Sequence, residues 1–380
     1  MTDPIVIGLT SGGTFLLAFL LFSHPQNNNI KANRMLGIFI FTLALSMLEI
    51  FLNTLNIQVK YPALFELIGL SRFLSAPALF MSVVYFTSIS KSLQIKDAWH
   101  LVPFFLFVIY SLPYLLTGVN INLSQSGSKI IFPIIANALP CQSVFYWYFS
   151  FKKLQKHQKN IQQISSSIDT INLLWLTKFL LIIGCIVLIW FNLLFFKIED
   201  LFNITPFLYL ICIYFLAYFS LRQKEIFGFK KVELIELNNV LEENDNLKSE
   251  KHKRLSDSQI QSEKNKLDQL MADKKIYLDN EISLPSLANL MNLSYHETSY
   301  LINECYGENF YSFVNKYRVA EAKRLLLSES IDQLNILGIA FQSGFNSKTT
   351  FNTTFKKMSG LSPTEFIKSM NIQNKVNKVK

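Results

Sequence analysis

Seven long apolar stretches fill the first 221 residues, and no other feature of the sequence constrains the fold more strongly. Each stretch is long enough to cross about 30 Å of hydrocarbon as a helix that rises about 1.5 Å per residue. A membrane-spanning helix also satisfies its own backbone hydrogen bonds, which a bilayer requires. The sequence therefore predicts a seven-helix transmembrane bundle. The approximate bounds of its helices are 5–22, 35–55, 62–86, 98–117, 130–151, 171–196 and 203–221.

Charge is distributed unevenly along the chain. Residues 1–221 contain 13 Lys or Arg and 7 Asp or Glu, whereas residues 222–380 contain 23 and 20. The net charges are therefore +6 and +3, so most of the basic excess lies in the apolar half and not in the polar half. The four cysteines form no CxxC pair and have no His or Cys at zinc-ligand spacing. We expect no disulfide framework, no metal site and no cofactor.

Basic residues between the apolar stretches predict the orientation in the membrane. The first, third and fifth loops, together with the residues after the seventh stretch, hold ten Lys or Arg; the other loops hold three. Cytoplasmic loops carry the excess of Lys and Arg. We expect a multi-pass protein of the cytoplasmic membrane, with its N-terminus outside and its C-terminal region in the cytoplasm.

Three ionisable residues, Glu49, Glu66 and Arg72, fall within the second and third predicted spans. Charges inside a bilayer are costly, so they pair with one another or line a water-filled cavity. One interpretation is an outward-facing pocket that senses a small-molecule ligand. The alternative is a structural Glu–Arg pair, or side chains that reach toward the membrane surface.

Residues 222–258 are polar and form a predicted cytoplasmic connector. Leu234, Leu237 and Leu241 have heptad-like spacing, which favours a short helix. Because the next heptad positions are Asn244 and Lys248, this seam is brief. A dimerising coiled coil and a solvated helix or flexible tether both remain open.

A helix-turn-helix pattern begins near residue 284. The stretch 284–291 predicts a short helix, and Asn292 begins a turn. Ser294 can cap the next helix, with Glu297 three residues later completing a capping box. Gly307 then ends that helix. This arrangement is the one that places a recognition helix in the DNA major groove.

The same pattern recurs after a longer helix predicted over 309–327. A short helix leads to a turn at Gly344, a position suited to positive φ. The stretch 347–358 predicts the second recognition helix, which Gly360 ends before Pro363 opens a last helix. Two units joined by a stiff helix can reach successive major grooves, about 34 Å apart.

The residues that match a known family are Leu284, Leu287, Ala288, Leu293, Ser294, Asn303, Gly307, Phe310, Phe313, Tyr317, Arg318, Ala322, Leu325, Leu326, Ile339, Ala340, Gly344, Phe345, Ser347, Phe351, Phe355, Lys356, Lys357, Gly360, Pro363 and Phe366. With these residues, a region of about 260–370 resembles the DNA-binding domain of AraC-family transcription regulators. The resemblance implies sequence-specific binding through both recognition helices. The seven-span half resembles, in architecture alone, the membrane segments of some membrane-bound members of that family.

The expected DNA contacts are the outward-facing side chains of the two recognition helices. The first helix has no Lys or Arg, so we expect it to contact bases through neutral polar groups, whereas the second should supply more phosphate contacts. In the first helix the candidates are Ser294, Tyr295, His296, Ser299, Tyr300 and Asn303. In the second they are Asn346, Ser347, Lys348, Thr349, Asn352, Thr353, Lys356 and Lys357.

These observations predict an all-α protein with four parts: a membrane domain (1–221), a connector (222–258), a DNA-binding domain (259–370) and a polar basic tail (371–380). We expect a membrane-anchored one-component transcription regulator. Its expected partners are double-stranded DNA and the lipid bilayer, with a small-molecule ligand and a homodimer as further candidates. The alternative is a membrane receptor or transporter-like protein whose C-terminal domain docks a protein partner. The sequence contains no catalytic motif, so we predict that the protein is not an enzyme.

Overall fold

The computed structural model describes residues 4–23, 28–88, 94–119, 125–195, 204–226, 236–237, 239–241, 255–328 and 335–377. These ranges are helical, apart from loops and an isolated bridge between Ser165 and Ser283. The chain divides into two compact units. The first unit contains residues 1–157 and 173–226, and the second contains 158–172 and 227–380.

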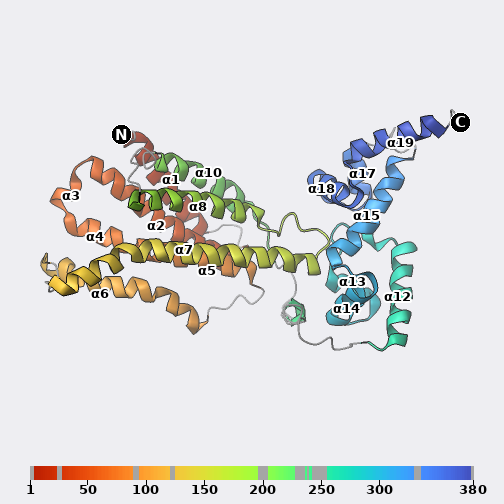
Figure 1. Cartoon of the computed structure of the whole chain (residues 1–380), viewed down its shortest axis with the longest axis horizontal. Helices are drawn as coiled ribbons and strands as arrows, with labels where there is room; N and C mark the ends of the chain where they lie inside the picture. Colours follow the sequence, from red (N-terminus) through yellow and green to blue (C-terminus); the bar gives the residue numbers. More distant parts are fainter. Residues whose placement is uncertain are drawn as a thin grey trace. The chain divides into compact units, whose positions relative to one another are not determined.

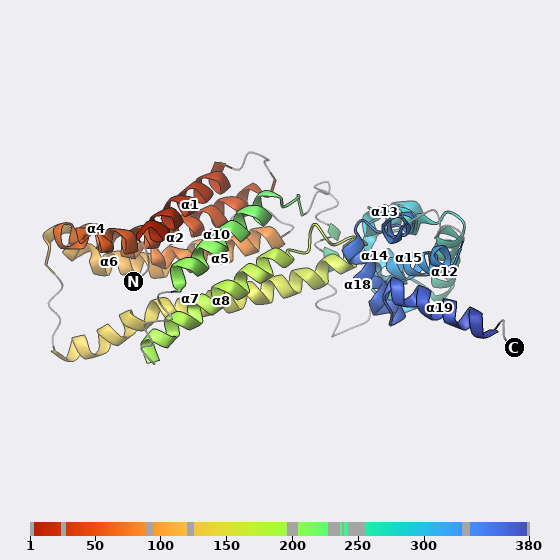
Figure 2. The same ribbon diagram turned by 90° about the horizontal axis from the view of Figure 1, so that it is seen from above.

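The first unit is a bundle of apolar helices (Figures 1 and 2). Helix α2 packs against α1 and α5, α10 packs against α1 and α8, and α4 packs against α6. In chain order the elements are α1 (Pro4–Ser23), α2 (Ile30–Thr54), α3 (Ile57–Lys60), α4 (Pro62–Leu70), α5 (Arg72–Thr87), η1 (Ile95–Leu101), α6 (Val102–Thr117), α7 (Gln125–Ile164), α8 (Leu174–Phe195) and α10 (Thr205–Leu221).

Close approach of α1 and α2 depends on Gly37. A Cβ atom at this position would lie 3.2 Å from the backbone oxygen of Ala18 and 3.3 Å from the backbone nitrogen of Phe22. Only a hydrogen fits there without a shift of one backbone. Small residues at helix contacts are typical of membrane bundles, where van der Waals packing drives association.

Four helical segments of the first unit are long and apolar enough to cross a membrane: Pro4–Ser23, Ile30–Thr54, Pro62–Thr87 and Ile95–Thr117. Leu174–Ile189 and Phe207–Leu221 are shorter apolar helices. These helices belong to the part of the chain that the structure describes, and the predicted count of seven spans stays a prediction.

Many large apolar side chains of these helices face outward. Phe19 is 67% exposed, Phe105 55% and Ile109 65%. In water such a surface would be unusually apolar for a folded domain, whereas lipid tails match it. The outer surface of the first unit is therefore compatible with a bilayer.

Helix α7 is longer than the sequence indicated. The predicted span ended at residue 151, with Lys152, Lys153, Lys156 and Lys159 in a loop, but the helix continues to Ile164. Lysine is a good helix former, so the loss of apolar residues does not end the helix. Its last residues, from Gln158, belong to the second unit.

The connector is described at residues 222–226, 236–237, 239–241 and 255–258. Leu237, Val240 and Leu241 are buried within the single chain, and a dimerising coiled coil stays a prediction. Leu234, Asn244 and Lys248 lie outside the described residues.

In the second unit, α15 runs between two helical pairs, α13–α14 and α17–α18 (Figure 1). Its 17 residues span about 26 Å at 1.5 Å per residue. The elements are α12 (Asp257–Ala272), η2 (Ile276–Leu278), α13 (Leu284–Met291), α14 (Tyr295–Tyr306), α15 (Phe310–Leu326), α17 (Ile336–Gln342), α18 (Lys348–Ser359) and α19 (Pro363–Asn377).

Aromatic side chains form the core behind α18. The rings of Phe345 and Phe351 have centroids 5.3 Å apart, and those of Phe351 and Phe355 lie 5.5 Å apart in edge-on contact. Phe366 of α19 extends this series. Each of the first three side chains is at most 1% exposed. Because these aromatic rings are buried, the opposite face of α18 points outward.

Candidate functional site

The N-terminus of α14 is held by the predicted capping box. The backbone N–H of Glu297 donates to Ser294 Oγ at 3.2 Å, and the backbone N–H of Ser294 donates to Glu297 Oε2 at 2.9 Å. The carboxylate of Glu297 is thus turned back onto its own helix end. This contact explains why an acidic residue is tolerated in a helix predicted to face DNA.

The turn before α14 also follows the sequence. Asn292 adopts φ 56° and ends α13, and Gly307 adopts φ 66° and ends α14. Asparagine and glycine are the residues that most readily adopt this left-handed conformation. The predicted helix-turn-helix of the first half is confirmed as a local structure.

Gly344 forms the second turn, as predicted, with φ 89°. A Cβ atom there would lie 2.5 Å from the carbonyl oxygen of Tyr277 and 3.0 Å from Arg318 Nε. The turn therefore packs directly against backbone and a buried side chain. Only glycine satisfies both the backbone conformation and the space.

The exposed face of α18 is basic and hydroxyl-rich. Lys348, Thr349, Thr353, Lys356 and Lys357 are exposed, and α18 contains no acidic residue. Asn346 is also exposed, and Ser347 and Asn352 are half-buried. A face of this composition suits contact with phosphates and base edges.

The predicted face of α14 needs a correction. Tyr295 and Ser299 were expected to point outward, but they are only 7% and 9% exposed. The buried face of α14 is therefore wider than expected, and it also includes Thr298, Leu301 and Ile302. Asn303 and Ser294 are exposed, and His296 and Tyr300 are half-buried.

Ser294 and Ser347 also have structural roles at helix ends. Ser347 Oγ accepts from the backbone N–H of Thr350 at 3.2 Å, as Ser294 does for Glu297. A side-chain cap satisfies one of the free N–H groups of the first turn. Contact of either serine with DNA stays a prediction.

A family profile described as "Helix-turn-helix domain" matches residues 287–369. This match covers α14, α15, α17 and α18. Residues 287–369 are therefore a helix-turn-helix domain. The helix-turn-helix domain is a DNA-binding domain of transcription regulators, which confirms double-stranded DNA as a partner at this coarse level.

Among solved structures, the chain is similar to "The C-terminal domain of AraT, a response regulator from Geobacillus stearothermophilus". The two share 28% sequence identity with a TM-score of 0.25, over 31% of this chain and 88% of that chain. No curated protein matches the chain significantly.

An unexpected buried charge lies within the helix-turn-helix domain. Arg318 of α15 is 1% exposed and was quoted from the sequence only as part of the family resemblance. Its Nε donates to the carbonyl of Tyr277 at 2.7 Å, and its Nη2 donates to the carbonyl of Asp279 at 2.8 Å. Burial lowers the pKa of Arg318 to about 10, so the side chain stays positive at neutral pH. Sequence periodicity did not indicate that this charged residue is buried.

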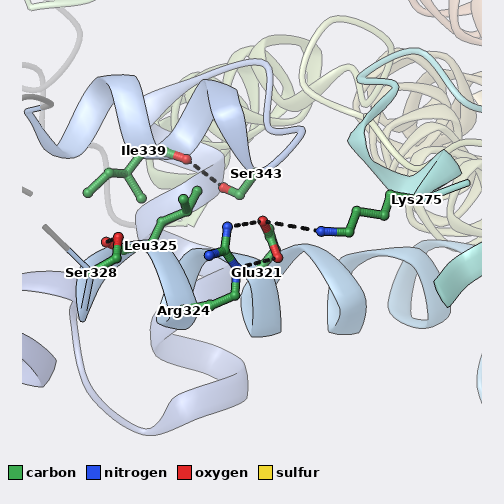
Figure 3. Close-up of polar contacts among 7 residues, drawn as sticks. All are labelled: Lys275, Glu321, Arg324, Leu325, Ser328, Ile339 and Ser343. Atoms are coloured by element: carbon green, nitrogen blue, oxygen red, sulfur yellow. Dashed lines mark hydrogen bonds and ion pairs between the residues drawn. The ribbon is translucent and has the colours of Figure 1, made fainter. Parts of the chain in front are cut away.

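Glu321 of α15 contacts Lys275, which lies between α12 and η2 (Figure 3). Its carboxylate accepts from Arg324 at 2.7 Å and 3.1 Å and lies 4.0 Å from Lys275 Nζ. The hydrogen bond from Arg324 lowers the pKa of Glu321 below its ordinary value of 4.5. The same view shows Ser343 Oγ donating to the carbonyl of Ile339 at 2.7 Å, which holds the end of α17.

The first unit contains a cavity of about 520 Å³. Its lining is mainly apolar and aromatic, with Glu66 and Arg72 among the few charged groups. The helices that contribute to it include α2, α5, α7, α8 and α10. The cavity is therefore built from more spans than the two that the sequence indicated.

The three ionisable residues predicted from the sequence occupy different places. Arg72 forms an ion pair with Glu49, which does not line the cavity. Glu66 Oε1 accepts a hydrogen bond from Ser111 at 2.6 Å. The structural Glu–Arg pair is thus present, and the cavity exists beside it.

Proposed function

We propose that this chain is a membrane-anchored, one-component transcription regulator. In this proposal the first unit spans the bacterial inner membrane seven times, with its N-terminus outside. The helix-turn-helix domain lies in the cytoplasm and binds double-stranded DNA. One observation carries the proposal: the same chain contains both the lipid-compatible helices of the first unit and a region, 287–369, that matches a helix-turn-helix domain.

The proposed DNA contacts lie on α14 and α18. On α14 they are Ser294, His296, Tyr300 and Asn303, with Tyr295 and Ser299 retained only as buried supports. On α18 and its cap they are Asn346, Ser347, Lys348, Thr349, Asn352, Thr353, Lys356 and Lys357. The three lysines of α18 neutralise phosphates, whereas Asn352 has an amide that can bond an adenine edge.

The cavity of the first unit is the proposed sensing site. Pockets of about 300–1,000 Å³ with apolar walls and a few polar groups are typical of small-molecule sites. The charged groups at its wall, Glu66 and Arg72, would orient the polar end of an otherwise apolar ligand. Such a ligand shifts the protein between states only if it binds one state more tightly.

The test is selection of duplex DNA from a random pool by the full-length protein in lipid nanodiscs, at a stated salt concentration. An enriched motif with two half-sites about one helical turn apart supports the proposal. Absence of enrichment, with a folded second unit, contradicts it and favours a receptor whose C-terminal domain docks a protein.

A further inference from the structure

The segment between α7 and α8 packs on the helix-turn-helix domain within the second unit. Together with the last residues of α7 it makes up the stretch 158–172 of this unit, which the sequence placed in a membrane-proximal loop and at the start of a span. Within the loop, Ser166 is buried, with 1% of its surface exposed. Ser166 Oγ donates to the carbonyl of Ile282 at 2.7 Å, and the Ser166 carbonyl accepts from Arg318 at 3.2 Å and Asn315 at 3.3 Å.

Beyond this buried anchor, the segment reaches the N-terminus of α18. Ser167 Oγ accepts from Asn346 Nδ2 at 2.7 Å. Asp169 Oδ2 accepts from Ser347 Oγ at 2.8 Å and also from Thr350 Oγ1. Two of the predicted DNA contacts, Asn346 and Ser347, are thereby engaged by the chain itself.

The chemistry of this contact resembles that of a DNA phosphate. An anionic oxygen at the start of a helix accepts hydroxyl hydrogen bonds and faces the positive end of the helix dipole. Asp169 supplies such an oxygen at the start of a helix that otherwise carries only basic charges. A carboxylate and a phosphate cannot occupy this position together.

The two ends of the segment differ in burial. Ser166 is fully buried, whereas Asp169 is exposed. Exposed charged contacts contribute little to stability and exchange readily with other partners. Residues 167–169 can therefore leave α18 while Ser166 stays in place.

We propose that residues 167–169 form an internal competitor that occupies the DNA-phosphate position of α18, with Asp169 as its anionic group. This inference rests on the proposed function, because it requires α18 to bind DNA. The segment is continuous in sequence with α7 and α8, two helices that line the cavity of the first unit. A change in those helices would thus alter how often residues 167–169 cover α18. The apparent DNA affinity would then follow the fraction of molecules in which α18 is uncovered.

The test compares the wild-type full chain with Asp169→Asn in nanodiscs. The probe is the duplex enriched from the random pool, at one fixed salt concentration. Asp273→Asn is the matched control, because Asp273 is an exposed acid of the same unit and its replacement changes the net charge equally. Asp169→Asn is expected to bind the duplex at least about fivefold more tightly than Asp273→Asn, within the usual range of coupling between sites.

A second variant, Thr350→Val, removes the other hydroxyl that bonds Asp169 but keeps the β-branched shape. We expect it also to tighten binding, and to add little when combined with Asp169→Asn, because both changes remove the same contact. Additive effects would contradict a shared mechanism.

The outcomes separate this inference from the proposed function. If the wild type binds the duplex and Asp169→Asn binds no more tightly than Asp273→Asn, the internal competitor is wrong and the regulator stands. If wild type and variants all fail to bind or enrich DNA, the proposed function fails and the inference with it.

Discussion

Arg318 Nη2 lies 3.0 Å from Ser166 Oγ, although the two residues are separated by 152 positions in the chain. This hydrogen bond joins the middle of α15 to the segment between α7 and α8. Arg318 also bonds the carbonyls of Tyr277 and Asp279. One buried guanidinium therefore connects three separate stretches of the second unit.

Replacing Arg318 with Met should destabilise the second unit by about 3 kcal/mol, because buried carbonyls lose a charged donor. Pulse proteolysis of the full chain across a urea series measures this free energy of unfolding. Lys316→Met is the control: the Lys316 side chain is 63% exposed and pairs with Glu308, so its loss should be much smaller. Equal effects of the two substitutions would show that the Arg318 contacts are not structurally important.

Gly344→Ala should destabilise the second unit by more than about 2 kcal/mol, since the left-handed backbone alone costs about 1–2 kcal/mol and a steric clash adds to it. The clash is with the carbonyl of Tyr277. Gly360→Ala is the matched control, because Gly360 also has a positive φ, 80°, but an added Cβ would meet nothing within 4 Å. The same proteolysis assay should rank Gly344→Ala as clearly the more harmful; the reverse order would contradict the close approach.

Glu321 should make the second unit sensitive to acid. Its folded-state pKa is lowered by Arg324, so its stabilising contribution is complete above the ordinary value of 4.5 and is lost as the pH falls through the folded value. Unfolding measured between pH 6 and about pH 3 should show this loss in the wild type. Glu321→Gln should be less stable at pH 6 and less dependent on pH below it. An unchanged pH profile in this variant would exclude Glu321 as the source.

Lys348 and Asn352 should affect DNA binding differently. Lys348→Ala should weaken binding to all sequences and reduce the slope of log affinity against log salt by about 1. Asn352→Ala should cost about 1–3 kcal/mol on the selected duplex and little on a random duplex. Titrations of both duplexes at several salt concentrations measure these effects. If both variants bind like the wild type, α18 does not contact the DNA as proposed.

Filling the cavity should remove the response of the regulator without removing DNA binding. Ala76 lines the cavity, so Ala76→Phe should reduce its volume. Leu106→Phe adds an aromatic ring on a side chain that is 63% exposed, and serves as the control. A transcription reporter, recorded under conditions that change its output in the wild type, should become unresponsive only in Ala76→Phe. A normal response in that variant would place sensing elsewhere.

Local sequence rules predicted the helix-turn-helix pattern well. The capping box of Ser294 and Glu297, and the positive φ of Gly344, follow from short-range hydrogen bonding and sterics. The burial of Tyr295 was not predicted, because the buried face of a helix depends on the neighbours against which the helix packs. The same holds for Arg318, whose partners are backbone carbonyls that carry no sequence signature.

The position of Asp169 was also beyond prediction. It lies in a stretch with no helical or strand periodicity, and its partners are 178 and 181 positions away. Hydrophobic patterning locates apolar spans, but it does not show where the polar residues between two spans pack.

The second unit is built from two separate stretches of the chain, 158–172 and 227–380. A protease that cut within residues 242–254 would therefore release an incomplete unit. The freed fragment would keep α14, α15 and α18 but leave Ser166 and Asp169 attached to the helices of the first unit. Cleavage would cost the fragment a buried partner for Arg318 and, at the same time, expose the first turn of α18.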